Sequence, residues 1–176
     1  MDKEIVLKAL KDGVDNVGPK EPNGDNKGPA IATYLATVGL PEGYAWCAAF
    51  IKYRLLKAAE DLGLNLSPEF KQISGWVPDW YNYAKKHNIW IPLEDVLKDN
   101  SLIKPGYLVL FWGSRRRRHY HIGMVKKRVN STFIEILEGN TDPGGLNKVN
   151  PDGDGVYVRR RKYKVLGANA GFIKLY

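Results

Sequence analysis

The chain has 176 residues, 44% of them hydrophobic and 26% charged, which is the size and composition of one ordinary globular domain. This composition excludes a mainly disordered chain, and no apolar run reaches the roughly 18 residues that a membrane-spanning helix needs. Charges interrupt the first residues, MDKEIVLKALKDG, so we do not expect a secretory signal there. The single cysteine, Cys47, excludes an internal disulfide.

The formal charge of +8 is concentrated in the C-terminal part of the chain. Residues 1–100 contain 12 basic and 14 acidic side chains, whereas residues 101–176 contain 15 and 5. Two runs, residues 115–118 and 159–162, supply most of this excess. A basic surface can attract nucleic acid, an anionic membrane or the anionic polymers of a bacterial wall, or it can be a solvated face. We find no zinc spacing, basic zipper or RNA-binding signature, so no nucleic-acid partner is expected.

The first hundred residues show helical periodicity and helix boundaries. Gly13, Gly39 and Gly63 are expected to end three helices, and Pro29 stands at a favourable first-turn position. The apolar residues of the longest helix recur at i, i+4, i+7 and i+11. The expected helices cover residues 3–11, 29–38, 46–62, 78–86 and 93–98.

After Pro105 and Gly106 the apolar residues alternate, as they do in strands. Helices followed by strands predict an α+β fold, with N-terminal helices packed on a C-terminal antiparallel sheet of about five strands. No repeat or linker is visible, so we expect a single domain over residues 1–176. The expected strands cover residues 107–112, 119–129, 132–139, 155–163 and 171–176.

Cys47 is predicted at the start of the longest helix, in the sequence GYAWCAAFI. The positive end of the helix dipole favours the nucleophilic thiolate, and the free backbone amides there can stabilise an oxyanion. A buried free cysteine is also a common core residue. Position alone therefore leaves catalysis and packing both open.

The two strands after residue 118 are predicted to form a hairpin that turns at Asn130 and Ser131. An even-numbered loop places His121, Glu138 and Asn140 on one face of the sheet, and an odd-numbered loop breaks this set. The even loop also sets Lys126 opposite Glu135 on the other face. The predicted pairs are His121 with Asn140, Gly123 with Glu138, and Val125 with Ile136.

A thiol nucleophile needs a base, and that base needs a partner that orients it. His121 with Glu138 or Asn140 meets this requirement. His119 is expected on the same face as His121 but farther from Glu138, and His87 is expected to cap or follow a helix end. We rank His121 first among the three histidines.

The order of the motifs WCAAF, HIGMV and EGNT resembles the cysteine, histidine-dependent amidohydrolases/peptidases, the CHAP family. EPNGDNKGPAIATYL, KPGYLVLFW and GDGVYVRRR fit the same pattern, and together the motifs cover residues 20–173. The resemblance implies a papain-like fold in which Cys47 is the nucleophile and His121 the general base. It further implies Glu138 as the orienting carboxylate and Asn140 as a supporting polar residue. Members of this family typically cut amide bonds in bacterial cell-wall peptidoglycan.

Two features depart from the family pattern. Tyr107 stands where many relatives have aspartate, and the run RRRR directly before His119 is unusually basic. Some relatives bind calcium ahead of the cysteine, but residues 28–46 contain only Glu42 as an acidic residue, so we expect no metal and no cofactor. Asp152 and Asp154 superficially resemble a calcium loop and are expected to be turn residues.

Aromatic residues near the nucleophile are candidates for substrate contact. Tyr44 and Trp46 flank Cys47 and, with His119, are the expected substrate-binding residues. Asn23 and Asn26 could orient substrate, although a turn role is the safer expectation. The other tryptophans could stack on sugars, but most are expected to pack in the core.

The resulting hypothesis is a metal-free cysteine hydrolase that cleaves an amide bond of peptidoglycan through a thioester. The alternative is a catalytically silent module that binds the wall or another polyanion. A phage lysin and an interbacterial toxin both fit a protein made in the bacterial cytoplasm that acts on the wall, and a toxin implies a cognate inhibitor protein. We expect a monomer with no membrane partner.

Overall fold

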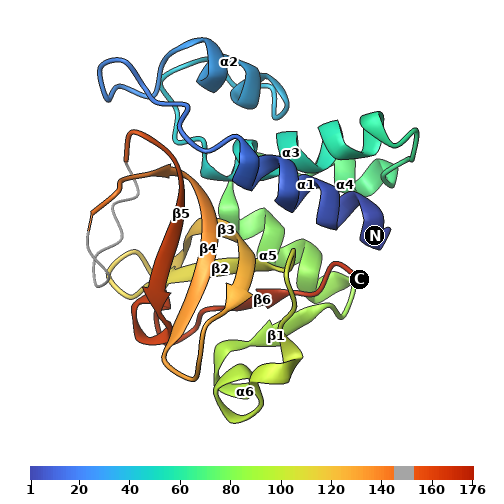
Figure 1. The fold of residues 1–176 in the computed structure, drawn as a ribbon, viewed down its shortest axis with the longest axis vertical. Coiled ribbons are helices and arrows are strands. Elements are labelled where there is room, and N and C mark those ends of the chain that lie inside the picture. Colours follow the sequence, from blue (N-terminus) through green and yellow to red (C-terminus); the bar gives the residue numbers. More distant parts are fainter. Residues whose placement is uncertain (145–152) are drawn as a thin grey trace.

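The computed structural model describes residues 1–144 and 153–176, and it has an α+β architecture with a helical N-terminal part and one antiparallel sheet (Figure 1). Two 3-10 turns, η1 and η2, lie at Asn100–Leu102 and Tyr163–Leu166. The helices are α1 (Lys3–Asp15), α2 (Pro29–Ala36), α3 (Cys47–Asp61), α4 (Pro68–Gln72), α5 (Val77–Lys86) and α6 (Leu93–Lys98). The strands are β1 (Trp90–Pro92), β2 (Leu108–Gly113), β3 (Arg118–Arg128), β4 (Phe133–Thr141), β5 (Gly155–Lys162) and β6 (Gly171–Ile173).

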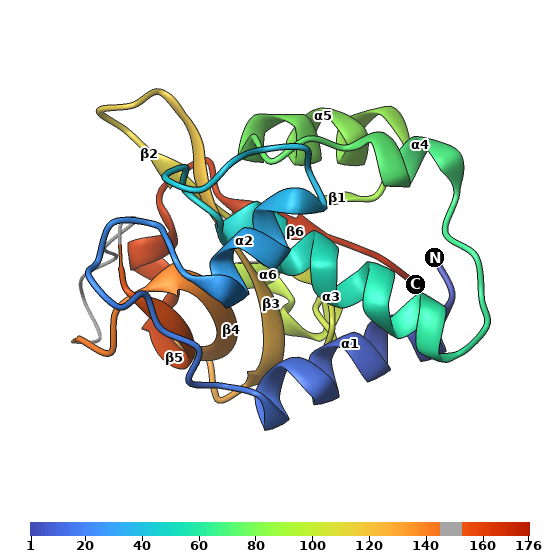
Figure 2. The same ribbon diagram turned by 90° about the horizontal axis from the view of Figure 1, so that it is seen from above.

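The sheet has the order β1-β6-β2-β3-β4-β5, and every neighbouring pair is antiparallel. Helices α1, α3 and α5 pack against the face that carries Leu110, Ile122 and Leu137 (Figure 2). The opposite face carries Phe111 and Ile136 and is covered by α6 and η2. Alternating residues of each strand therefore enter two separate apolar layers.

The predicted order of helices and strands is confirmed, with three differences. Helix α1 continues through Gly13, which was expected to end it. A Cβ at Gly13 would collide with the side chain of Leu137, so this glycine permits close packing of α1 on the sheet. Helix α4 and strand β1 were not expected. Both are short, and β1 is defined only by its pairing with β6.

Within the described residues, no helix has both the length and the apolar character required to cross a membrane.

Candidate active site

Cys47 is the first residue of α3, as the sequence predicts. No side chain caps this end of the helix, so its first backbone amides remain available to a ligand. The thiol-bearing residue is only 4% exposed, yet it lines a narrow cleft of about 110 Å³. Trp76 and Tyr120 line the same cleft. A substrate carbonyl that reaches Cys47 therefore meets a thiol and a helix N-terminus together.

The β3-β4 hairpin has the predicted parity close to the site. Gly123 lies opposite Glu138, and Val125 lies opposite Ile136. Closer to the turn, a register shift places Lys127 opposite Glu135 and Arg128 opposite Ile134, so the predicted pairing of Lys126 with Glu135 and the predicted even-numbered loop are both wrong. Lys126 is an extra residue in the ladder at this point.

The side chain of Lys126 nevertheless remains close to Glu135, with 3.4 Å between Nζ and Oε2. The irregularity lies toward the turn of the hairpin, beyond the Val125 pair. It therefore leaves His121 and Glu138 on the predicted face.

His121 is fully buried in β3, and its Nε2 lies 2.9 Å from Oε2 of Glu138. Nε2 is thus hydrogen-bonded to the carboxylate. Nδ1 makes no well-aligned hydrogen bond within the described residues, and the Cys47 thiol lies beside the ring. The structure therefore brings Cys47, His121 and Glu138 together in the order that a thiol, its base and an orienting carboxylate require.

Glu138 is held from its other side by Arg161 of β5. Arg161 donates from Nε to Oε1 and from Nη2 to Oε2, both at 2.8 Å, and both side chains are fully buried. Nη2 also donates to Oγ1 of Thr141 at 3.1 Å. Two parallel bonds to one carboxylate fix its plane, and hence the position of the oxygen that accepts from His121.

The charges of this group support one another. Burial alone would favour neutral Glu138, but hydrogen bonds from Arg161 and His121 outweigh it and lower the pKa of Glu138 to about 2. Burial also disfavours the imidazolium, but interactions with Cys47 and Glu138 outweigh it and raise the pKa of His121 to about 9. At neutral pH this electrostatic environment favours a carboxylate beside a protonated imidazole.

Gly123 provides the space in which Glu138 lies. A Cβ at Gly123 would come within 2.9 Å of the carbonyl oxygen of Leu137 and 3.0 Å of Cγ of Glu138. It would also collide with Ile136. A glycine in the middle of β3 therefore permits close approach of the strand that carries the carboxylate.

The predicted pairing placed Asn140 opposite His121, and the structure does not place it there. Its backbone adopts the left-handed conformation, with φ of 55°, and the β4 ladder is irregular between Glu138 and Thr141. Its Oδ1 accepts the backbone N–H of Trp46 at 3.0 Å, and its Nδ2 donates to Asn26 Oδ1 and to Gly153 O, each at 3.0 Å. Asn140 therefore supports the residue before the nucleophile instead of the base.

Glu21 extends this second polar network. Its Oε1 accepts from the indole Nε1 of Trp46 at 2.6 Å, and its Oε2 accepts from the backbone N–H of Asn26 at 2.8 Å. Trp46, an expected substrate-binding residue, is instead fully buried and lies outside the described lining of the Cys47 cleft, where its hydrogen bonds hold the start of α3. Tyr44 is 54% exposed and lies outside the described lining of the Cys47 cleft.

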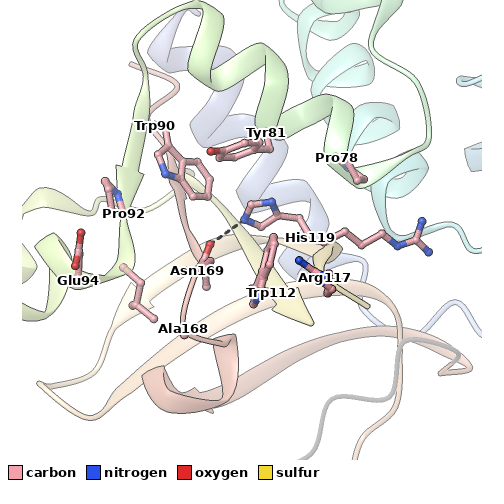
Figure 3. Close-up of a pocket in the computed structure, with 13 residues that line it drawn as sticks. Pro78, Tyr81, Trp90, Pro92, Glu94, Trp112, Arg117, His119, Ala168 and Asn169 are labelled. Atoms are coloured by element: carbon pink, nitrogen blue, oxygen red, sulfur yellow. Dashed lines mark hydrogen bonds between the residues drawn. The ribbon is translucent and has the colours of Figure 1, made fainter. Parts of the chain in front are cut away.

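His119 lies two residues from His121, but it has a different environment. The β2-β3 ladder shifts between Phe111 and Trp112, so that Trp112 pairs with His119 and Phe111 with His121. Nε2 of His119 lies 3.0 Å from the carbonyl oxygen of Asn169, and burial lowers its pKa. His119 lines the Cys47 cleft and a larger neighbouring cavity of about 520 Å³ (Figure 3).

His87, the other rival base, follows α5 and lies 3.1 Å from Glu69 through its Nε2, away from the cysteine. The described residues contain no group of three or more His, Cys, Asp and Glu side chains that could hold a metal ion. Asp152 lies outside the described residues. Asp154 accepts a hydrogen bond from the hydroxyl of Tyr157 at 2.9 Å.

Two residues of the site were not anticipated from the sequence, Arg161 and Glu21. Arg161 belongs to a basic run that was expected at the surface, either to attract a polyanion or as a solvated face, although alternation along β5 requires one side of that run to face the sheet interior. Glu21 comes from an irregular loop before α2, where no periodicity indicates which residue turns inward.

A cysteine at a helix N-terminus, a histidine beside it and a carboxylate behind the histidine form a site suited to acyl transfer through a thiol. Comparison of this chain with protein-family models, curated proteins and solved structures finds no match.

Proposed function

We propose that the protein is a cysteine hydrolase that cleaves an amide bond in bacterial cell-wall peptidoglycan. The single observation that carries the chemistry is the placement of His121 between Cys47 and a carboxylate that Arg161 holds in two bonds. A core cysteine needs neither a base nor a buried charge behind it. Burying three ionisable groups is costly unless they are paired, so such a cluster is typical of a functional site.

In the reactive form of the site the Cys47 proton lies on His121, in keeping with the raised pKa of this imidazole, and the Cys47 thiolate attacks the amide carbonyl carbon. The backbone N–H of Cys47 and a neighbouring donor stabilise the oxyanion. The C–N bond breaks, the imidazolium of His121 protonates the leaving nitrogen, and a thioester to Cys47 remains. Neutral His121 then takes a proton from water, the hydroxide attacks the thioester, and the carboxylic acid leaves as the thiol is regenerated. No metal or cofactor takes part in these steps.

The substrate class rests on the resemblance to the CHAP family, whose motifs occur here in order. The papain-like fold belongs to the same proposal, and the contact of α3 with β3 and β4 is consistent with it. A phage lysin or a toxin delivered to rival bacteria fits this activity best. In the second case a dedicated inhibitor protein would protect the producing cell.

The test is digestion of purified cell walls by the wild type, Cys47→Ala and His121→Ala. Both variants are expected to lose activity by a factor of at least about 10³, because the nucleophile and its base act as a unit. His87→Ala is the matched control, since this half-exposed histidine pairs with Glu69, and it should retain wild-type activity. Full activity in both Cys47→Ala and His121→Ala would exclude the proposed mechanism.

The alternative, a silent binding module, predicts an inert thiol. Iodoacetamide should alkylate Cys47 faster in the wild type than in His121→Ala if the imidazole assists formation of the thiolate. Equal and slow alkylation of both, with retained binding to walls, would favour the silent module.

A further inference from the structure

The cavity of about 520 Å³ beside the site is continuous in its lining with the Cys47 cleft. The two share Pro78, Arg118 and His119. Figure 3 shows Tyr81, Trp90 and Trp112 around the ring of His119, with the hydrogen bond from this ring to Asn169. A molecule bound in the cavity can therefore extend along a common wall to the thiol.

Arginines occupy this common wall. Arg117 and Arg118 line the cavity, and Arg116 and Arg118 line the Cys47 cleft. In the part of the chain that the structure describes, neither these three nor Arg115 forms an ion pair with a carboxylate. The wall between cavity and cleft thus presents guanidinium groups that pair with no carboxylate of the described residues, and the one acidic side chain among the described lining, Glu94, lies apart from Arg117 (Figure 3).

Two of these arginines are positioned by aromatic rings. The guanidinium of Arg116 lies 5.3 Å from the ring centroid of Tyr120, and that of Arg118 lies 5.9 Å from the ring centroid of Trp76. A guanidinium that stacks on a ring keeps its in-plane N–H donors available for a carboxylate. Arg117 adopts a left-handed backbone, with φ of 51°, at the tight turn between β2 and β3.

The aromatic side chains that line the cavity pack around the ring of His119. The centroid of the His119 ring lies 4.6 Å from that of Tyr81, 5.3 Å from that of Trp90 and 5.1 Å from that of Trp112. All three aromatic residues are partly buried. These rings therefore form a fixed apolar floor of the cavity, which Arg117 and Arg118 also line.

We propose that this cavity binds a carboxylate-bearing peptide segment of the substrate, next to the scissile amide, and that Arg117 and Arg118 hold the carboxylate. This inference rests on the proposed function and adds to it the chemistry that selects the substrate. An apolar floor with cations at its edge suits a short acidic peptide, whose backbone and methyl groups contact the rings while its carboxylate meets the guanidiniums.

The test compares two synthetic peptidoglycan stem peptides that differ only in whether the carboxyl group beside the scissile amide is free or amidated. The wild type should cleave the free acid with kcat/KM higher by about tenfold, since hydrogen bonds from guanidinium groups to a carboxylate are stronger than those to a neutral amide. Arg117→Gln/Arg118→Gln should lose this preference, mainly through a higher KM for the acid. Arg115→Gln, which lines neither cleft, should keep it.

Equal cleavage of both peptides by the wild type would overturn this inference and leave the proposed function intact. An unchanged preference in the double variant would also overturn it, because the carboxylate would then be held elsewhere. Absence of any cleavage of walls or peptides would instead contradict the proposed function. In that case, calorimetry measures the binding of the two peptides to Cys47→Ala. Tighter binding of the free acid supports the proposed cavity site. Equal binding of the two peptides, or displacement of the acid by peptide-free glycan, refutes it.

Discussion

Arg161 and Glu138 form a fully buried ion pair with two hydrogen bonds, each 2.8 Å long, and the same carboxylate accepts from His121. The pair is therefore both a structural element of the sheet and the support of the base. Removal of the arginine would leave a buried carboxylate that has lost its two-bond partner and keeps the hydrogen bond from His121.

We expect Arg161→Met to lower the free energy of unfolding by about 3–5 kcal/mol, the usual loss when one member of a buried pair is removed. Arg161→Lys should retain part of the stability, because it keeps the charge but loses the two-bond geometry. Urea unfolding measures both effects. Arg160→Met is the matched control, since Arg160 is exposed and stacks on Phe133 at 4.6 Å; a loss in Arg161→Met no larger than in this control would contradict the account.

The pH dependence of activity should report the raised pKa of His121. The imidazolium must protonate the leaving nitrogen, so kcat/KM should fall on the alkaline side with an apparent pKa near 9. Glu138→Gln removes the negative charge that helps to raise this pKa, and its alkaline limb should move to lower pH. The pH profile of a soluble peptide substrate measures the shift, and superimposable alkaline limbs would exclude the role of Glu138.

The same two groups predict how stability varies with pH. The pKa of His121 is higher in the folded protein, so its contribution is complete below about pH 6.5 and is lost as the pH rises toward 9. The pKa of Glu138 is lower in the folded protein, so its contribution is present above about pH 4.5 and is lost toward pH 2. The joint contribution of the two groups to the free energy of unfolding should be greatest between about pH 4.5 and pH 6.5. Urea unfolding of the wild type and of Glu138→Gln from about pH 2 to about pH 9 measures it.

Asn140→Ala should damage the site without changing its pH profile. The variant loses the acceptor for the Trp46 N–H and places alanine at a φ of 55°, so we expect a loss of about 2–4 kcal/mol in stability. Its kcat should fall because the start of α3 is less well held. Asn23→Ala, in the exposed loop, is the control, and a shift of the alkaline limb like that of Glu138→Gln would contradict this assignment.

Wall digestion should slow as salt concentration rises. Residues 101–176, which include His121 and Glu138, carry the excess of basic residues, and under the proposed function the substrate is an anionic wall. The screening length shortens from about 10 Å at 0.1 M to about 3 Å at 1 M salt. Cleavage of a short uncharged amide should stay constant over the same range. If salt slows the cleavage of both substrates equally, or slows neither, the charge has no role in wall binding.

Alternation and helix-end rules could predict the elements that meet at the site. Gly123 and Glu138 face each other, as the alternation of the two strands predicts, because the register shift at Lys126 restores this pairing beyond the turn. Cys47 begins a helix whose apolar residues recur with helical spacing. The register shift at Lys126 could not be predicted, since an extra residue on an exposed stretch leaves both apolar patterns intact.

The supporting residues were harder to predict because their roles depend on partners far away in the sequence. A run of three arginines does not indicate that Arg161 turns inward to Glu138. Asn140 was placed with His121 by an ideal ladder, whereas its left-handed backbone turns it toward Trp46 and Glu21. Buried polar networks of this kind are set by tertiary packing, which local periodicity does not encode.

The most direct test of the central claim is mass spectrometry of purified peptidoglycan after incubation with the wild type and with Cys47→Ala. The account predicts that the wild type releases fragments with one new amine and one new carboxyl group at a single kind of amide bond, and that Cys47→Ala releases none. Identical fragments from both proteins, or glycosidic cleavage with every amide intact, would contradict it.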